Sequence, residues 1–558
     1  MRICTQCKKE FEVKDRDQEF YVKIGVPEPK LCPPCRYQRR LAHRNERTLY
    51  RRKCDATGKD IVAIYPQESP YTVYEQTYWR SDAWDARQYG CDVDFSRPFF
   101  EQLQELRLAV PRLSLNSPES ENSEYTNQSQ RNKDCYMLVS CGNNEHVFYS
   151  MWSHYGKDLM DVYMAFESQR SYEAVGVNNS YNVRWSKMCD NCTDCSFCFD
   201  CRGCSDCFMS TNLRNKSYVW ENEQLSKDEY ARRLATLNLG YYVTIEELKA
   251  RAYKKWEQAI HRFADQRKCE RSTGDNLFSV ENVFDSFHIG KSVDCSYCQD
   301  CIEMKDSYDC TEVAIDFELN YEVHGAAAIY RGTVLNLCSF LKFSSYCDSS
   351  FYADYLFGCV GVKRANHCIL NKQYTAEEYD RLVPKIIAHM KEVGEWGEYF
   401  PVETSVFSYN ETTAQEYFPL SKEEVIARGW KWQDAMPGTF GKETIAWGAV
   451  PDDIKDTQDT LCSETLACSE TGKNFKIIKP ELEFYKSMNI PIPRLHPDTR
   501  FVKRMALRNP RELYHRQCMC DRVGHDHVEH CMVEFETTYA PERPEMVYCE
   551  ACYQKEII

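Results

Sequence analysis

The chain of 558 residues carries 31 cysteines and a formal net charge of −15. Its length exceeds what one ordinary core supports, so several structural units are expected. The negative charge excludes a protein that coats nucleic acid over its whole surface, and 13% aromatic residues with only 22 glycines favour half-buried strands over disorder. No secretory signal and no membrane-spanning apolar run is recognised. We therefore expect a reduced, cytoplasmic chain, in which clustered cysteines favour metal over disulfides.

Two C-x2-C pairs, CTQC and CPPC, lie close together near the start of the chain. Each tight bend offers two sulfurs, and two such bends complete the tetrahedral shell of a structural zinc ion. The expected ligands are Cys4, Cys7, Cys32 and Cys35.

The stretches CTQCKKEF, DQEFY and CPPCRYQRR resemble the zinc-ribbon (treble-clef-like) domain family of bacteria, from Cys4 to Arg40. More loosely, the whole chain is similar to cysteine-rich zinc-ribbon proteins of candidate-phyla bacteria. Neither resemblance implies an established activity.

The C-terminal end repeats this module. A shift of 464 positions without a gap sets Cys4 on Cys468 and Cys54 on Cys518, and after ten inserted residues Tyr74 falls on Tyr548. So many matches in one register predict a duplication.

The C-terminal copy carries its metal ligands in its other half. Of the four cysteines that form the expected zinc site of the first copy, the C-terminal copy retains only Cys468. One cysteine is too few for an equivalent site. Its second half gains the pair Cys549 and Cys552. Two of three further cysteines would complete a four-sulfur shell: Cys518, Cys520 and Cys531. The inserted loop also holds His525, His527 and His530, which form either a solvated loop or a further ligand or second metal site. About two structural zinc ions are expected.

A basic helix is predicted at the same place in each copy, with cationic residues at spacings of three and four and therefore largely on one face. In the first copy these are Arg36, Arg39, Arg40, Arg44 and Arg47. In the second copy they are Arg500, Lys503, Arg504, Arg508 and Arg511. Such stripes either contact nucleic-acid phosphates or pair with the protein's own carboxylates.

The middle of the chain repeats a short pattern. From Asn122 to Asn222 an aromatic or apolar pair recurs at somewhat irregular steps of roughly ten residues, and a second block from ENVFDS to NHCILN repeats the theme. Short strands with polar bends favour a parallel β-helix, or β-solenoid, in which two half-turns would make one coil of about 21 residues. Several small antiparallel sheets are the alternative.

The two blocks are themselves duplicated at an offset of 149, and each leads into a helix with a capping-box start, at Ser226 and at Thr375. Further capped helices are expected over about 244–263 and at Ser421. The predicted fold class is mainly β with helical inserts, in which duplicated zinc-ribbon modules flank a β-solenoid. The segments are an N-terminal module at 1–95, a first solenoid block at 96–225, a helical insert at 226–270, a second block at 271–373, a helical connection at 374–455 and a C-terminal module at 456–558.

The stretch MCDNCTDCSFCFDCRGCSDCF places a cysteine at every third residue: Cys189, Cys192, Cys195, Cys198, Cys201, Cys204 and Cys207. Strand side chains alternate between faces, so a period of three requires frequent bends, such as the corners of a β-helix. Buried thiols packed as small hydrophobes in a ladder are favoured. Zinc or another thiophilic ion, an iron–sulfur cluster and disulfides are the alternatives.

No phosphate-loop, nucleophile-elbow or metalloprotease motif is recognised, and the terminal zinc sites have closed shells. The sequence therefore predicts a non-enzymatic, structural-zinc interaction or scaffold protein. Its partner would be a protein or RNA, without a membrane or a small-molecule substrate. Two other functions remain open: an RNA- or DNA-binding protein using the paired basic helices, and a metal-storage or redox protein using the 189–207 tract.

Overall fold

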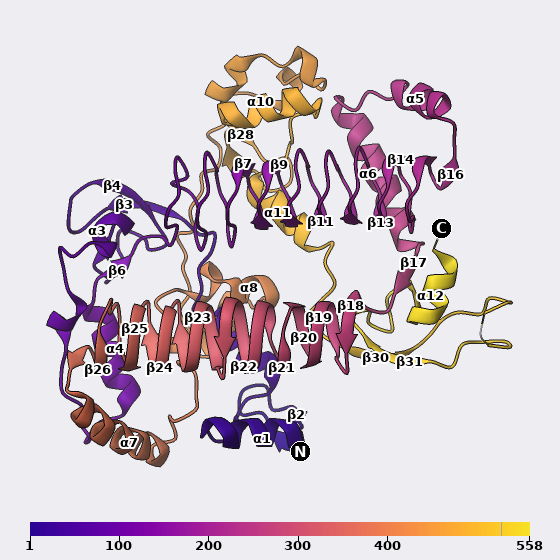
Figure 1. Ribbon diagram of the computed structural model, residues 1–558. Helices are drawn as coiled ribbons and strands as arrows, with labels where there is room; N and C mark the ends of the chain where they lie inside the picture. Colours follow the sequence, from indigo (N-terminus) through magenta and orange to yellow (C-terminus); the bar gives the residue numbers. More distant parts are fainter. Residues whose placement is uncertain (526, 558) are drawn as a thin grey trace. The chain divides into compact units, whose positions relative to one another are not determined.

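The computed structural model describes residues 1–525 and 527–557 (Figure 1). The described chain is mainly β, with twelve α-helices and cysteine clusters at both ends. It divides into two compact units, one of residues 1–115 with 264–436 and the other of residues 116–263 with 437–558. Each terminal module thus belongs with the block of strands that is not its neighbour in sequence, and the six predicted segments combine into two units.

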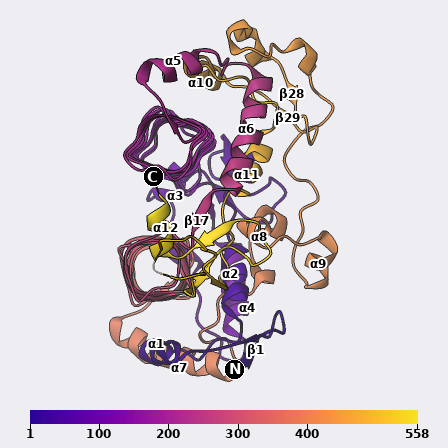
Figure 2. The same ribbon diagram turned by 90° about the vertical axis from the view of Figure 1, so that its right-hand side faces the viewer.

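Each block of strands is a coil with twelve residues per turn. In the unit that contains the first block, β10 (Tyr163–Phe166), β11 (Val175–Asn178), β12 (Lys187–Asp190) and β13 (Phe199–Arg202) pair in parallel, and every residue faces the one twelve positions later. Viewed nearly end-on, each coil is a closed, four-sided ring (Figure 2). The remaining strands of this block are β7 (Glu145–Phe148), β8 (Met151–His154), β9 (Lys157–Met160), β14 (Ser205–Phe208), β15 (Ser217–Trp220) and β16 (Glu223–Gln224).

The corners of the coil recur at every third residue. Met188, Asn191 and Asp194 have φ of 56°, 52° and 53°, and this left-handed conformation continues at the same spacing along both blocks. Each left-handed residue turns the chain, and the residue after it points into the coil. The prediction that two ten-residue half-turns make one coil is therefore wrong, because one turn consists of four three-residue sides.

The second block has the same geometry. Its register also pairs residues twelve apart, as in Ala327 with Ser339 and Leu335 with Cys347. The spacing differs at two places: Gln266 pairs with Leu277, one residue fewer, and before an irregularity between Ala314 and Glu318, Tyr308 pairs with Tyr321, one residue more. The strands are β18 (Gln266–Glu270), β19 (Gly274–Phe284), β20 (Ser286–Gly290), β21 (Val293–Ser296), β22 (Gln299–Glu318), β23 (Tyr321–Asn336), β24 (Ser339–Asp348), β25 (Phe351–Phe357), β26 (Asn366–Ile369) and β27 (Lys372–Gln373).

Three of the four predicted helix starts have a side-chain cap, but the capping box predicted at Ser226 is only half formed. Ser226 accepts a hydrogen bond from the backbone of Glu229 before α5 (Lys227–Ala235), and capping boxes begin α7 (Ala376–Glu392) and α9 (Lys422–Ala427). The fourth differs: α6 (Tyr242–Glu257) begins two residues early, without a side-chain cap. It also ends earlier than predicted, because the chain passes into β17 (Ile260–Arg262), which pairs with the C-terminal module.

The two modules contain the same elements in the same order. At an offset of 464, β1 (Arg2–Ile3), β2 (Glu10–Phe11), α1 (Asp15–Ile24), α2 (Pro33–Leu41) and β3 (Tyr50–Lys53) match β28 (Leu466–Ala467), β29 (Asn474–Phe475), α10 (Lys479–Met488), α11 (Pro497–Met505) and β30 (Tyr514–Gln517). After the ten-residue insertion, β4 (Asp60–Ala63), β5 (Val73–Tyr74) and α3 (Gln76–Arg80) match β31 (Glu534–Thr537), β32 (Met546–Tyr548) and α12 (Glu550–Glu556).

Shorter elements link these parts. They are η1 (Ala86–Tyr89), α4 (Phe99–Ala109), β6 (Arg112–Leu113), η2 (Val402–Thr404), η3 (Tyr409–Glu411), α8 (Thr413–Tyr417), η4 (Trp447–Ala449), η5 (Ile454–Asp456) and η6 (Asp459–Ser463).

Candidate metal centres

The N-terminal module brings its four predicted cysteines together. Their Sγ atoms lie within 4.8 Å of one another, and Cys7 Sγ is 3.7 Å from Cys32 Sγ. Zinc–sulfur bonds of about 2.3 Å in a tetrahedron place two sulfurs roughly 3.8 Å apart. Cys4, Cys7, Cys32 and Cys35 therefore fit one zinc ion with a closed shell.

Local backbone structure holds the two cysteine bends in place. Lys8 adopts a left-handed conformation and donates its backbone N–H to the Cys4 carbonyl at 3.0 Å. Thr5 N–H donates to the Lys30 carbonyl at 3.1 Å and so ties the first bend to the second. Cys32 caps α2, and the hydrogen bond from the Cys35 thiol lowers the pKa of Cys32 to about 5. This hydrogen bond favours the thiolate form in which cysteine binds a metal.

The C-terminal module forms its four-sulfur group in its second half. Cys518, Cys531, Cys549 and Cys552 have their Sγ atoms within 4.8 Å of one another, with Cys531 and Cys549 3.9 Å apart. Of the three candidate cysteines, Cys518 and Cys531 therefore complete the shell. The third, Cys520, lies with His525, His527 and Cys552 in a separate group of close ligand atoms, and His530 is exposed.

In each module, one cysteine at the position of the other module's candidate metal ligand makes a hydrogen bond instead. Cys468, the counterpart of Cys4, lies 3.6 Å from the hydroxyl of Thr499, the counterpart of Cys35. Cys54, the counterpart of Cys518, accepts a hydrogen bond from the backbone of Glu75 at 3.3 Å. The same contact exists in the C-terminal module, where Cys518 accepts from the Cys549 backbone at 3.2 Å. The scaffold is shared, and only the ligands differ.

The first basic helix is turned toward the coil. Arg36 and Arg40 are almost fully buried and pair with Asp309, with Arg36 Nη2 at 2.9 Å and Arg40 Nη1 at 3.2 Å. Arg39 and Arg40 also bind Glu322 at 2.8 Å and 2.9 Å. Burial acts to raise the pKa of Glu322, but the charges of Arg39 and Arg40 hold it below its usual value.

The second basic helix repeats this arrangement in its own unit. Arg504 Nη1 binds Asp161 Oδ1 at 2.6 Å, and Arg500 Nη1 lies 3.3 Å from Asp161 Oδ2. Both arginines are buried, and Arg500 also pairs with Glu481 at 3.4 Å. Asp161 and Asp309 are each left-handed corner residues of a coil, with φ of 56° and 55°.

The other predicted cations also have partners within the chain. Arg44 is buried and pairs with Glu46 and Glu312, and Arg47 lies 3.8 Å from Glu416. In the second copy, Lys503 pairs with Glu470, Arg508 donates to the Tyr163 hydroxyl, and Arg511 is half-buried. Buried, paired guanidinium groups are not available to nucleic-acid phosphates, so the geometry favours the intramolecular interpretation of both stripes.

The thiols of the 189–207 tract point into the first coil. All seven are almost fully buried. Cys192 Sγ donates to the carbonyls of Asp190 at 3.4 Å and Cys201 at 3.3 Å, and its neighbours in the ladder repeat the pattern. Serines at equivalent positions do the same, as Ser150 does with Phe148 at 2.7 Å. The small polar side chain thus gives a second hydrogen bond to carbonyls that already accept a backbone N–H, as Asp190 does from Gly203 and Phe148 does from Asp161.

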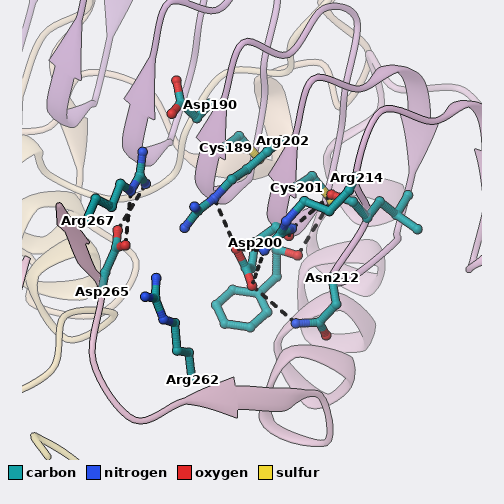
Figure 3. Close-up of polar contacts among 12 residues, drawn as sticks. Cys189, Asp190, Asp200, Cys201, Arg202, Asn212, Arg214, Arg262, Asp265 and Arg267 are labelled. Carbon is teal, nitrogen blue, oxygen red and sulfur yellow. Dashed lines mark hydrogen bonds and ion pairs between the residues drawn. The ribbon is translucent and has the colours of Figure 1, made fainter. Parts of the chain in front are cut away.

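The outward corner residues form a second contact with the C-terminal module. Asp200 binds Arg214 at 3.1 Å and Asn212 at 3.2 Å beside the buried Cys201 (Figure 3). Arg214 also donates to the hydroxyl of Tyr553 at 2.7 Å, and that hydroxyl bonds Asp200. Because Tyr553 follows the metal ligand Cys552 in α12, the four-sulfur group is connected to the coil. No periodic signal in the sequence marks this contact.

The comparison with protein families confirms the resemblance at the start of the chain. Residues 1–44 match the model of the family described as "Probable treble clef domain". This segment therefore has the family's zinc-binding cysteine pattern, and the structure brings those cysteines together. A search of curated proteins found no match. Over the described residues, no helix is long and apolar enough to cross a membrane.

Proposed function

We propose that this chain is a non-enzymatic scaffold in which zinc-bound modules are clamped onto two parallel β-solenoids. The observation that carries the proposal is the buried contact between each basic helix and a corner carboxylate, Arg36 and Arg40 with Asp309 and Arg500 and Arg504 with Asp161. Removing one partner of such a buried pair costs about 3–5 kcal/mol. The modules are thus bound firmly to their platforms.

Zinc would stabilise the position of the helices that contact the coils. Cys32 and Cys35 lie at the cap and first turn of α2, so a metal bound to them fixes the helix from which Arg36 and Arg40 reach the coil. In the other unit, Cys552 fixes α12, from which Tyr553 reaches Asp200. Four protein ligands around each ion leave no open position for a substrate, which supports a structural role.

A partner protein would bind the exposed aromatic ladder of the second coil. Phe340 and Tyr352 stack with ring centroids 4.6 Å apart, and Phe343 and Tyr355 stack at 5.0 Å. Phe340 is 48% exposed and Tyr352 is 56% exposed. Exposed aromatic side chains are enriched at protein interfaces, and the net charge of −15 disfavours RNA as the partner.

The clamp can be tested by hydrogen exchange on the full chain, zinc-loaded and after chelation. We expect α2 and the strands around Asp309 to lose protection together when zinc is removed. The matched control is α7, which carries no proposed ligand and should change little. Unchanged protection of α2 after complete zinc removal would contradict a structural role for the metal.

A further inference from the structure

The inserted loop of the C-terminal module carries a group of ligand atoms outside the four-sulfur site. Cys520 Sγ, His525, His527 and Cys552 Sγ each offer one atom, and these atoms all lie within 4.8 Å of one another. Cys552 also belongs to the four-sulfur group. The N-terminal module lacks this loop, so it has no counterpart to the two histidines.

His525 is oriented as a metal ligand is. Its Nδ1 lies 3.0 Å from Cys520 Sγ, while its Nε2 lies 3.2 Å from the carboxylate of Glu556. Metal-binding histidines usually donate their outer N–H to a carboxylate, which fixes the tautomer and leaves the other nitrogen free to bind the ion. Glu556 lies in α12, the same helix as Cys552.

His527 lies against this group with its polar atoms unused. Both of its ring nitrogens are buried, and neither has a hydrogen-bond partner among the residues that the structure describes. Its ring centroid is 5.8 Å from that of His525. A buried polar atom without a partner destabilises the fold. A cation bound by His527 removes that cost.

Among the loop residues that the structure describes, the large apolar side chains are not packed together. Val523 and Val528 are 97% and 96% exposed, while Cys520, His525 and His527 gather their ligand atoms with that of Cys552. Hydrophobic burial therefore does not explain why this segment folds as it does. Metal binding does, because ligands contributed from the loop and from α12 close it onto the module.

We propose that the C-terminal module binds a second zinc ion through Cys520, His525, His527 and Cys552, with the Cys552 thiolate shared between the two ions. The inference rests on the proposed structural-zinc role of the module. Two sulfur and two imidazole ligands are a typical zinc set. With the first ion in place, the second displaces one proton, that of Cys520, since both imidazoles bind neutral. Five thiolates and two Zn²⁺ then carry a net charge of −1.

The test is native mass spectrometry of the full chain loaded with zinc. We expect three zinc ions per chain, and two in the His525→Ala/His527→Ala variant. His530→Ala, in the same loop but exposed, is the matched control and should keep three. Cys35→Ser should also leave two, by losing the N-terminal ion. Loss of no zinc from Cys35→Ser would count against the proposed function, independently of the histidine result.

The second site would be overturned if the natural chain held two zinc ions, one in each module, and the His525→Ala/His527→Ala variant kept both. Because the double variant could disturb the loop, Glu556→Gln provides a milder test. It should make the second ion about 10-fold easier to remove with a competing chelator, since outer ligands typically contribute 10–100-fold in metal affinity. X-ray absorption should show zinc–nitrogen bonds in the natural chain and none in the double variant.

Discussion

The two terminal modules share one scaffold but hold metal in opposite halves. The first half of the N-terminal copy has four cysteines, where the C-terminal copy has Cys468 bonded to Thr499. The second half of the C-terminal copy has the four-sulfur group, where the N-terminal copy has Cys54 bonded to the Glu75 backbone. Both copies keep the buried arginines. The comparison teaches that a four-cysteine group in either half of the module is compatible with a basic helix anchored to its coil.

The largest expected effect is a loss of zinc and stability, and it should occur in the first half of the N-terminal module but not in the first half of the C-terminal module. Cys35→Ser should release one zinc ion and unfold the N-terminal module, because a structural zinc ion contributes about 10–16 kcal/mol of binding free energy at pH 7. The equivalent change in the other module, Thr499→Ser, should leave both zinc content and the unfolding midpoint almost unchanged. Zinc analysis with thermal unfolding measures both. Equal losses in the two variants would remove the distinction between the halves.

The second effect concerns the corner carboxylates. Asp161→Asn should lower the free energy of unfolding by about 3–5 kcal/mol, since Arg500 and Arg504 lose the charge that they share. Asp309→Asn should cost a similar amount, because in each group one arginine keeps a second carboxylate, Arg500 with Glu481 and Arg40 with Glu322. Asp158→Asn, at a more exposed residue of the preceding corner, is the control. Denaturant unfolding measures all three variants, and a loss from Asp161→Asn no larger than that from the control would contradict the role of the corner carboxylates.

A smaller, pH-dependent effect distinguishes His43 from its counterpart Leu507. Burial lowers the pKa of His43 to about 3, from about 6.5 in the unfolded chain. The neutral ring therefore stabilises the fold above pH 6.5, and this contribution is lost as the pH falls toward 3. At pH 5 the loss is about 2 kcal/mol.

His43→Leu should remove that part of the acid sensitivity between pH 7 and pH 5. Its cost at pH 7 is a hydrogen bond to the Phe400 carbonyl. Urea unfolding of both proteins at the two pH values measures the difference. An unchanged pH dependence in the variant would exclude His43 as its source.

The smallest effect is expected in the thiol ladder. Cys195→Ser should cost about 1 kcal/mol and leave the zinc content unchanged, because serine occupies the same inward position at Ser150 and Ser186 and bonds the same type of carbonyl. Cys195→Trp is the contrast, since the largest side chain in this interior cluster is leucine, as at Leu159 and Leu213, and overpacking a filled core is destabilising. If the serine variant lost a metal ion, the hypothesis that this tract binds metal would be supported instead.

Local patterns predicted the parts of the molecule that depend on short-range chemistry. The C-x2-C pairs predicted the four N-terminal cysteine ligands that lie together, and the offset of 464 predicted a duplication, whose two copies have matching elements. The period of three in Cys189–Cys207 indicated bends at the same interval, which the φ angles confirm. These cysteines occupy consecutive inward positions of the coil, and serine, alanine and valine are found at inward positions elsewhere. The repeated cysteine made this part of the pattern recognisable in the sequence.

Contacts between distant segments could not be predicted from the sequence. The pairing of Arg36 with Asp309 spans 273 positions, and no local pattern marks one corner aspartate among many as its partner. The true turn of twelve was hidden because only some corners carry aromatic residues, which made the visible spacing irregular. Cys520 could not be separated from Cys518 and Cys531 by spacing alone, since the loop fold decides which sulfurs converge.

The twelve-residue turn limits how this protein can change in length. Inserting or deleting one residue would move the later side chains from the inside of the coil to a corner or a face, unless the turn itself absorbs the change as an irregularity. Additions of twelve residues need no such irregularity. Each added turn lengthens a coil by about 4.8 Å, the spacing between paired strands. The length of each coil could therefore change during evolution in steps of one whole turn. Two irregular turns show where a change of one residue was tolerated: a longer one at Ala314–Glu318, and a shorter one in which Gln266 pairs with Leu277.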